Sequence, residues 1–180
     1  MRFGVKVAEN EKEFDKKWGN WYVAYHGTQG EFAASILSSG LRVSIPECYY
    51  EQGRPRVYLS PSIEYCAHPR YARPWKKIKK NGKPFWYQLV FQCRVNPKSV
   101  QMIEPETLIA DDNKQIISID PNFSNTELTW IISVKEGIHY LDQDIILYGI
   151  MMRISNVDPK NLLQSVWWRL THLENFPYDT

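Results

Sequence analysis

The sequence predicts one α+β domain in which short strands outnumber helices. Runs rich in aromatic and β-branched residues recur along the chain, and Asn, Asp, Gly and Pro separate them. Few segments carry apolar residues at helical spacing. A chain of 180 residues lies within the usual size of one domain and can bury an apolar core without disulfide or metal staples. We therefore expect a single domain over 1–180, with its core at about 20–155 and a helical extension at 156–180.

The first expected elements are a strand, a turn and a helix. The run 21–25 consists of aromatic and small apolar residues and predicts a strand. The segment 32–37 has helical spacing, and Gly40 after it is suited to end a helix because glycine adopts the left-handed backbone conformation easily.

A second strand and a second helix are expected after a loop. The segment 46–55 has Gly and Pro close together and predicts the loop, after which 57–60 resumes as a short strand. Pro61 suits the first position of a helix, where the missing N–H of proline is not needed. Ser60 is then the expected N-cap of that helix.

The strongest strand signal is the run 85–95, which is ended by Asn96-Pro97. A basic turn precedes this run, and Asn81-Gly82 within the turn favours a hairpin. Three further short strands are expected between turn residues, at 116–119, 128–132 and 148–154.

The last expected element is a helix that docks on the sheet. Asp158-Pro159 resembles an N-cap followed by a first helical residue, and apolar residues form one stripe over 162–170. Trp167-Trp168 could form an exposed pair that binds a partner, but the amphipathic spacing favours core packing for at least one ring.

Charge and cysteine content exclude some classes of protein. The net charge is 22 − 20 = +2, which by itself names no partner. The three cysteines include no C-x-x-C pair, so neither a disulfide framework nor a zinc site is suggested, and we expect no bound metal. A reducing compartment, cytoplasmic or nuclear, fits best. No apolar run approaches the roughly 20 residues of a membrane helix, so no membrane is expected, and we expect a monomer.

The most specific motif is Tyr25-His26-Gly27-Thr28, followed by Ile-Leu-Ser-Ser-Gly-Leu at 36–41. It resembles the H-G-(S/T) … I-L-x-x-G-L signature of poly(ADP-ribose) polymerases and related transferases. A strand that delivers an imidazole beside a glycine leaves the glycine backbone free to grip a flat amide ligand. The resemblance implies that Gly27 holds the nicotinamide amide of NAD, that His26 hydrogen-bonds the adenosine ribose, and that Thr28 assists nearby.

The second motif is the segment 57–65, Val-Tyr-Leu-Ser-Pro-Ser-Ile-Glu-Tyr. It is similar to the stretch in which this family sandwiches nicotinamide between two aromatic rings and bonds its carboxamide with a hydroxyl. Tyr58, Tyr65 and Ser62 would fill those roles by resemblance. Stacking suits the ligand because the cationic pyridinium of NAD is attracted to the electron-rich faces of aromatic rings.

The third motif is the segment 125–132, Asn-Thr-Glu-Leu-Thr-Trp-Ile-Ile, which is similar to the family's catalytic N-x-E before a strand. Glu127 would complete a His-Tyr-Glu triad with His26 and Tyr58. Cleavage of the glycosidic bond develops oxocarbenium character on the ribose, which a fixed carboxylate stabilises. Taken alone, a Glu before a strand is more often a solvated charge.

Together the motifs cover roughly residues 20–155, in the family's order, and look closest to a subgroup found beside neuralized-type domains and in fungal relatives. The resemblance implies the ADP-ribosyltransferase fold, with two packed, mostly antiparallel sheets, short flanking helices and an NAD cleft. It implies an enzyme that uses NAD as substrate and transfers ADP-ribose to a protein or nucleic-acid acceptor. Glu127 is compatible with single-unit transfer and, in the family, with chain elongation; we expect single units, because nothing in the sequence specifies a surface for a growing polymer. The alternatives are an NAD glycohydrolase and a non-catalytic module that binds NAD, ADP-ribose or a protein. RNA 2′-phosphotransferases share the general fold, but Glu127 disfavours them.

Other features carry less information. The strip 75–83 interleaves basic and aromatic residues and could bind phosphate or contact an acceptor, although a solvated hairpin tip is the commoner case. One of Arg54 and Arg56 could meet the NAD pyrophosphate or simply carry surface charge. The remaining histidines lack partners at metal-ligand spacing and are interpreted as surface or capping residues; they are His68, His139 and His172.

Overall fold

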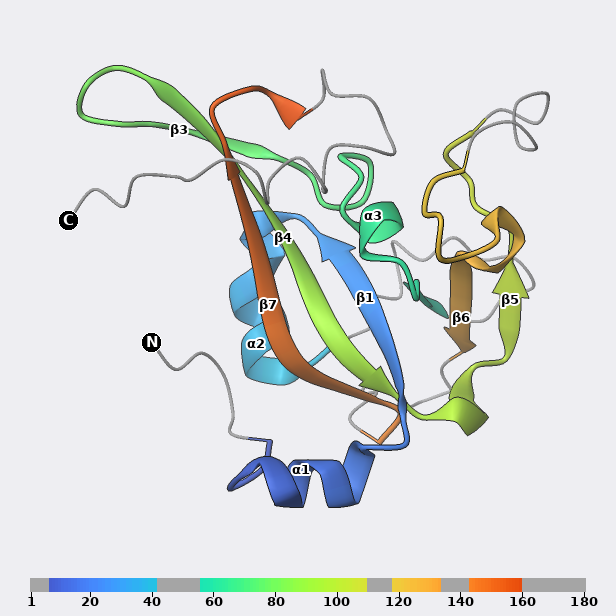
Figure 1. The fold of residues 1–180 in the computed structure, drawn as a ribbon. Helices are drawn as coiled ribbons and strands as arrows, with labels where there is room; N and C mark the ends of the chain where they lie inside the picture. The colour runs from blue at the N-terminus through green and yellow to red at the C-terminus, as the bar shows by residue number, and fades with distance from the viewer. Residues whose placement is uncertain (1–6, 42–55, 110–117, 134–142, 160–180) are drawn as a thin grey trace.

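The fold is known from a computed structural model that describes residues 7–41, 56–109, 118–133 and 143–159. Its helices and strands are short, except for two long strands that pair with each other in the larger sheet (Figure 1). The elements in chain order are α1 (Glu11–Trp18), β1 (Tyr22–Thr28), η1 (Gly30–Phe32), α2 (Ala33–Ser39), β2 (Arg56–Leu59), α3 (Ile63–Cys66), β3 (Trp75–Ile78), β4 (Pro84–Val95), η2 (Pro97–Ser99), β5 (Met102–Glu104), η4 (Asn125–Glu127), β6 (Thr129–Ser133) and β7 (Ile145–Ser155).

The larger sheet is antiparallel and is built on β4. One edge of β4 pairs with β7 over almost its whole length, with a register shift between Gln92 and Cys93. The other edge pairs first with β3, at residues 84–87, and then with β1, at residues 89–95. β4 is therefore central at every level, and the predicted strand at 85–95 is confirmed.

The smaller sheet is also antiparallel and has the order β2-β6-β5. Tyr58 of β2 lies opposite Ile131 of β6, and Met102 of β5 lies opposite the same residue on its other side. A two-bond backbone bridge between Tyr25 and Ser60 joins this sheet to β1, with N···O distances of 2.8 and 3.1 Å. The α+β class with two antiparallel sheets and short helices, expected from the sequence, is confirmed.

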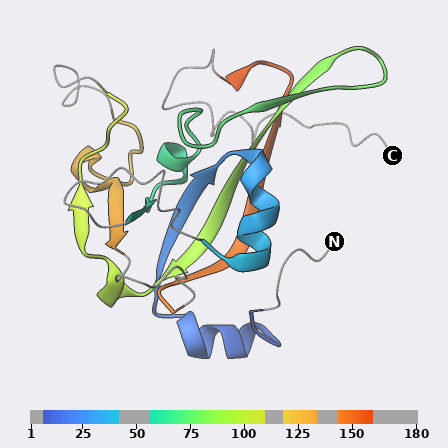
Figure 2. The ribbon, with the colours of Figure 1, turned by 180° about the vertical axis from the view of Figure 1, so that it is seen from behind.

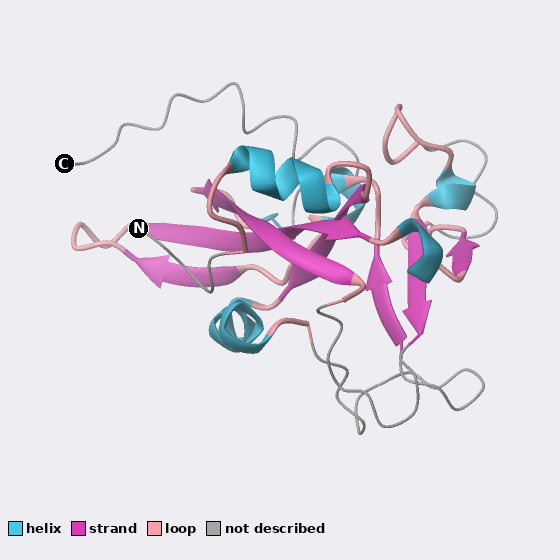
Figure 3. Cartoon of the chain, turned by 90° about the horizontal axis from the view of Figure 1, so that it is seen from below, coloured by secondary structure: helices cyan, strands magenta, loops and turns pink. Residues whose placement is uncertain are grey.

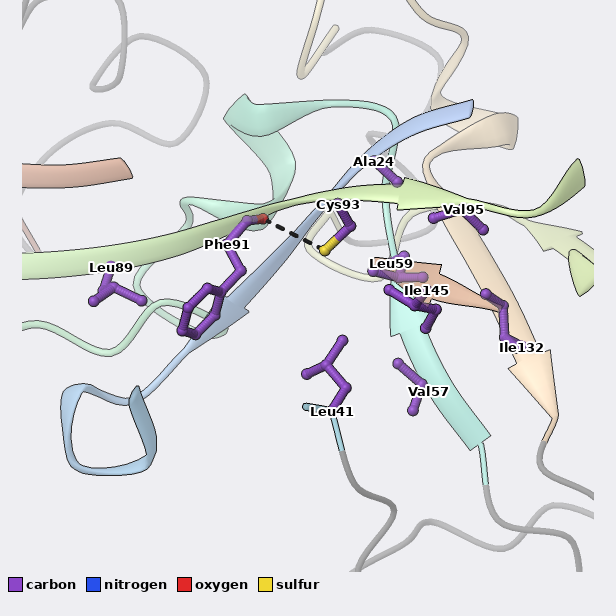
Figure 4. Close-up of a cluster of buried hydrophobic side chains, with 10 residues drawn as sticks. All are labelled: Ala24, Leu41, Val57, Leu59, Leu89, Phe91, Cys93, Val95, Ile132 and Ile145. Atoms are coloured by element: carbon purple, nitrogen blue, oxygen red, sulfur yellow. Dashed lines mark hydrogen bonds between the residues drawn. The ribbon is translucent and has the colours of Figure 1, made fainter. Parts of the chain in front are cut away.

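The main core lies between one face of the larger sheet, helix α2 and the inner face of the smaller sheet. Figure 4 shows side chains from both sheets converging on this cluster, which contains Ala24, Leu41, Val57, Leu59, Leu89, Phe91, Cys93, Val95, Ile132 and Ile145. Ala33, Ile36 and Leu37 of helix α2 are partly buried and pack against this cluster. Figure 2 shows α2 in front of the larger sheet. Helix α1 lies on the opposite face, as Figure 3 shows from below.

Local chemistry explains several elements that the sequence predicts. Helix α2 ends at Gly40, whose φ of 75° is in the left-handed region. The turn between β3 and β4 closes through Gly82, whose φ is 77°, and through a bond from Lys79 N–H to the Lys83 carbonyl, so the hairpin at Asn81-Gly82 is confirmed. The strands expected at 21–25, 57–60, 128–132 and 148–154 correspond to β1, β2, β6 and β7.

Two local expectations are wrong. The second helix does not begin at Pro61 with Ser60 as its N-cap, because the bridge to Tyr25 keeps Ser60 in extended backbone. The helix begins at Ile63 instead, with Ser62 as the N-cap. The segment 116–119 is not a strand where it is described, since residues 118 and 119 are irregular and the Ile119 N–H donates to a side chain rather than to a neighbouring strand.

Helix α1 is an element that the sequence prediction missed. Its N-cap is Asn10, whose side-chain oxygen accepts from the Glu13 N–H at 3.0 Å, while the Glu13 carboxylate accepts from the Glu9 N–H. This reciprocal capping resembles an N-terminal signature that a search for N-x-x-E would have found. The helix docks through Phe14, whose ring packs at a tilt of 48° against Tyr148 of β7, with 5.2 Å between ring centroids.

Other expectations lie outside the described residues. They are the loop at 46–55, the terminal helix beyond Pro159, and the individual positions Cys48, Arg54, His139, Trp167, Trp168 and His172.

The buried position of Phe91 provides a test of the core. We expect Phe91→Ala to lower the free energy of unfolding by about 3–5 kcal/mol, because the fully buried ring leaves a cavity between the sheets. The matched control is Phe32→Ala, since the Phe32 ring is 45% exposed and should cost far less. Urea unfolding of both variants measures the difference, and equal losses would contradict the position of the core.

Candidate functional site

His26 and Tyr58 lie on neighbouring strands that belong to different sheets. The His26 Nδ1 atom lies 3.0 Å from the backbone carbonyl oxygen of Tyr58. A carbonyl can only accept, so Nδ1 carries the proton and donates it, which leaves Nε2 as the acceptor of the neutral ring. The strand pairing thus fixes both the tautomer and the orientation of His26.

The environment of His26 favours its neutral form. Burial is the larger effect and lowers its pKa from the ordinary 6.5, while the bond to the Tyr58 carbonyl opposes this in part. At neutral pH the ring is therefore a hydrogen-bond acceptor through Nε2. Such a group can accept a hydrogen bond from a hydroxyl group of a ligand.

Tyr58 has a backbone and a side chain in contrasting environments. Its carbonyl is bonded to His26, but its ring is 41% exposed, whereas Val57 and Leu59 on either side are buried in the core. The alternation of β2 therefore turns the Tyr58 ring away from the main core. An exposed aromatic face at this position is available to a flat ligand.

Gly27 is packed tightly against the segment that follows α3. An added Cβ would lie 2.2 Å from the Cys66 carbonyl oxygen, 3.0 Å from the Tyr71 Cβ and 3.1 Å from the Ala72 nitrogen. Two of these three atoms are backbone, so they cannot move aside cheaply. Internal packing therefore requires glycine here whether or not a ligand also approaches. Thr28, the next residue, is buried at the end of β1.

The Cys66 thiol fills the space where β1 and β2 meet. It donates to the Tyr25 carbonyl at 3.0 Å and lies against the backbone N–H groups of Gly27 and Ser60. Burial raises its pKa to about 12, so the thiol stays protonated at neutral pH. Cys66 is thus an internal contact of the HGT segment rather than a reactive nucleophile.

Ser62 is fully buried and is committed to internal partners. Its Oγ accepts from the Tyr65 N–H at 3.1 Å, which caps α3, and donates to the Asp120 carboxylate at 2.7 Å. Asp120 in turn accepts from the backbone and side chain of Asn122. The bond ties α3 to the loop that precedes β6.

Tyr65 is likewise buried, at 5% exposure, and its hydroxyl is the centre of a polar network. It lies 3.0 Å from the Thr129 Oγ1 and receives bonds from the Thr107 N–H and the Tyr71 hydroxyl. The ring packs on Tyr71 at 5.0 Å between centroids. The Tyr65 side chain is therefore an internal contact that supports β6 in this structure.

Glu127 is exposed at the end of η4, immediately before Leu128 and β6. The turn that carries it is well fixed: Ser124 caps the Thr126 N–H and accepts from the Glu127 N–H through its carbonyl. The Glu106 N–H donates to the Asn125 carbonyl at 2.8 Å, which ties η4 to the segment after β5. Across the described residues, no hydrogen bond joins Glu127 to His26 or Tyr58.

The structure thus brings the predicted residues together in two groups. His26, Gly27, Thr28 and Tyr58 lie where β1 meets β2, whereas Ser62 and Tyr65 lie on α3 beneath that junction. Glu127 ends η4, two residues before β6, the strand that pairs with the strand of Tyr58. The Tyr25–Ser60 bridge and the β2–β6 pairing therefore place β1, β2 and β6 side by side.

Sequence reasoning missed the acidic residues around this region. Asp120 and Glu106 are both buried, and the Glu106 carboxylate accepts from the Leu108 and Ile109 N–H groups at 2.6 and 2.8 Å. Both belong to short loops with no periodic signal, although Asp-Pro-Asn at 120–122 is a recognisable turn sequence. Of the arginines noted before Tyr58, Arg56 is buried, so it is not a simple surface charge.

The comparisons with known proteins add no assignment: neither the scan of family models nor the search of curated proteins returned a match to the chain. Within the described ranges, no helix has the length and apolar character needed to span a membrane. The same residues contain no group of three or more His, Cys, Asp or Glu placed to hold a metal ion. His68 acts as a local cap, since its Nδ1 accepts from the Arg70 N–H.

The packing of Gly27 can be tested by a pair of glycine substitutions. Gly27→Ala should destabilise the fold by about 3 kcal/mol, because overpacking against backbone atoms forces the strands apart. Gly149→Ala in β7 is the control, since the three atoms nearest to the added methyl all belong to the Gln92 side chain: Oε1 at 2.8 Å can turn away, and Cβ at 3.1 Å needs to shift by only a few tenths of an ångström. Thermal unfolding measures both, and a loss for Gly149→Ala that matches Gly27→Ala would contradict this explanation.

The protonation of His26 gives a second test. Because its pKa is lowered in the fold, the unfolded chain takes up the proton first as the pH falls below about 6.5, and stability decreases from that pH downward. Above that pH the group contributes no pH dependence. NMR titration of the imidazole protons should place the pKa of His26 below 6.5 and that of His68, which is half-buried near Arg70, at about 4. A His26 pKa above 6.5 would exclude a neutral ring held in a partly buried site.

Proposed function

We propose that the protein has the ADP-ribosyltransferase fold and is an NAD-dependent transferase that moves single ADP-ribose units to a macromolecular acceptor. The observation that carries the proposal is the contact of His26 with Tyr58 across the junction of the two sheets. This contact links the first two motifs of the resemblance. The pairing of β2 with β6 brings in the third motif, because β6 begins just after Glu127. Motifs that are distant in sequence thus lie on, or directly before, strands that are neighbours in space.

In the proposed reaction each triad residue has a separate task. The His26 Nε2 accepts a hydrogen bond from a hydroxyl of the adenosine ribose, and the exposed Tyr58 ring stacks on nicotinamide. The bond between C1′ of the nicotinamide ribose and the pyridinium nitrogen breaks, and nicotinamide leaves as a neutral molecule with both bonding electrons. The acceptor nucleophile bonds to that C1′ and releases its proton to solvent. Glu127 orients the ribose and stabilises the positive charge that develops on it.

Ser62 and Gly27 could contact the ligand as predicted only by exchanging their present hydrogen-bond partners for it. The Ser62 hydroxyl is bonded to Asp120, so a carboxamide could use it only by replacing that bond. The Gly27 N–H likewise faces the Cys66 thiol. Thiols form weak hydrogen bonds, so an amide oxygen is a stronger acceptor for this N–H than the sulfur that it would displace. Binding of NAD therefore shifts α3 relative to β1.

Two other functions have specific support. The exposure of Glu127 to solvent favours water as an acceptor, which would give an NAD glycohydrolase. The internal bonds of Ser62 and Tyr65 favour a non-catalytic module that binds the ADP-ribose portion of NAD, free ADP-ribose or a protein, since both side chains predicted to hold nicotinamide already have partners. The two alternatives differ from the transferase in their products.

The deciding experiment measures nicotinamide release from NAD labelled in its adenylate portion, with and without cell extract as a source of acceptors. Label on a macromolecule supports the transferase, and free ADP-ribose alone supports the hydrolase. Binding of NAD without nicotinamide release supports the module and excludes both enzymes.

Substitution of Glu127 tests the catalytic assignment. Glu127→Gln should reduce nicotinamide release by at least about 100-fold while keeping NAD affinity within a few-fold, because the amide keeps the shape and loses the charge. The control is Glu31→Gln, another exposed carboxylate beside a short helix. His26→Ala should instead weaken NAD binding, measured by calorimetry. Near-normal turnover of Glu127→Gln would remove Glu127 from the mechanism.

A further inference from the structure

The charges of the chain are strongly segregated along the sequence. The segment from Tyr65 to Ile103 contains nine basic residues and no acidic residue, although the whole chain is nearly balanced. The remainder has 22 − 9 = 13 basic residues against 20 acidic ones, a net charge of −7. Asymmetry of this kind is typical of proteins that present a basic element to a polyanion.

Five of those basic residues lie on a single hairpin, which projects from the larger sheet in Figures 1 and 2. All five are exposed: Lys76, Lys77, Lys79, Lys80 and Lys83. β7 still pairs with β4 at Trp86 and Tyr87, so the hairpin has only two strands beyond that point: the end of β3 at residues 77–78 and the start of β4, joined by a polar turn. It is therefore a narrow ribbon with cationic side chains.

The lysines occupy both faces of the ribbon. Side chains alternate along β3, so Lys76 points to one face and Lys77 to the other. On the first face Lys76 lies opposite Trp86, with its ammonium 5.6 Å from the ring centroid. On the second face the Lys77 ammonium lies 6.0 Å from the Tyr87 ring. Cation–π contacts on both faces hold the charges in place.

The root of the ribbon is rigid. Trp75 stacks on Tyr87 at 5.7 Å with an interplanar angle of 21°. The same Trp75 ring fills the space beside Gly30, where an added Cβ would lie 2.6 Å from it. A rigid root keeps the lysines at fixed positions and lowers the entropy lost on binding.

Protection of a sheet edge explains only part of this pattern. β3 is an edge strand, and lysines on an edge prevent pairing with other chains. The turn residues Lys79, Lys80 and Lys83 lie beyond the strand, where there is no edge to protect. The polar turn also argues against insertion into a membrane, for which apolar residues at the tip would be needed.

We propose that the β3–β4 hairpin binds duplex DNA by entering its major groove. A two-stranded ribbon with cations on both faces matches two phosphate walls, one on each side. Measured from face to face with its side chains, a sheet is about 10 Å thick, and the major groove of B-form DNA, about 12 Å wide, admits such a ribbon. A single strand or a flat surface would meet one face only. The narrow major groove of A-form RNA excludes the ribbon.

The test is fluorescence anisotropy of the whole chain with a labelled 20-base-pair DNA duplex of mixed sequence, across a series of salt concentrations. With about four phosphates neutralised, binding should weaken about 100-fold between 50 and 200 mM salt. The same sequence as single-stranded DNA and as an RNA duplex should bind at least about tenfold more weakly. Vesicles containing phosphatidylserine should bind more weakly still. No NAD is present, so the result is independent of the proposed transferase.

Matched variants locate the contact on the ribbon. K76Q and K77Q remove one charge from each face, and each should reduce the salt slope by about one. K76R and K77R keep the charge and should keep the slope, while K16Q on exposed α1 is the control for net charge. Circular dichroism checks folding. Equal or tighter binding of single-stranded DNA, RNA duplex or vesicles would overturn the proposal, as would no binding or equal effects of K16Q and K76Q.

Discussion

The backbone bridge between Tyr25 and Ser60 is the contact on which the architecture depends. Each residue donates to the carbonyl of the other, so two backbone pairs are satisfied where the two sheets meet. The bridge sets β2 beside β1 and thereby brings the Tyr58 carbonyl to His26. Gly27 and the Cys66 thiol complete the junction, because both must be small for α3 to approach β1 closely. Bulk at any of these positions would separate the sheets.

The sequence predicts β1, β2, β4, β6 and β7, because these strands are runs of aromatic and β-branched residues. It does not assign the short strands β3 and β5. It fails where a tertiary contact overrides a local preference. Ser60 has the chemistry of an N-cap, but its backbone is used by the bridge, so Ser62 caps α3 instead. Helix α1 was missed because its apolar content is low, and its stability depends on capping and on Phe14. Neither effect follows from periodicity.

The candidate site is predicted in part. The sequence places His26 and Tyr58 on strands, and the structure joins them. Spacing alone could not reveal that the Ser62 hydroxyl is bonded to Asp120, 58 residues away. It could not reveal either that Tyr65 is enclosed by Thr107 and Thr129, because these partners come from loops and strands that periodicity does not connect. Long-range polar contacts of this kind depend on the completed fold.

Charge is distributed unevenly between the two ends of the molecule. The basic hairpin and the smaller sheet lie at opposite ends of the fold in Figures 1 and 2. Near that sheet, the described residues 102–109 and 118–133 include four acidic side chains and no basic one; the acids are Glu104, Glu106, Asp120 and Glu127. Glu106 and Asp120 are buried, and two basic residues lie beside these segments: Arg56 begins β2, and the Arg70 guanidinium donates to the Thr107 carbonyl. The smaller sheet therefore has charges of both signs around it, whereas the hairpin carries five lysines and no acid. A polyanion is attracted most strongly to the hairpin and reaches the fold from the side of β3, so electrostatics favours one orientation of approach.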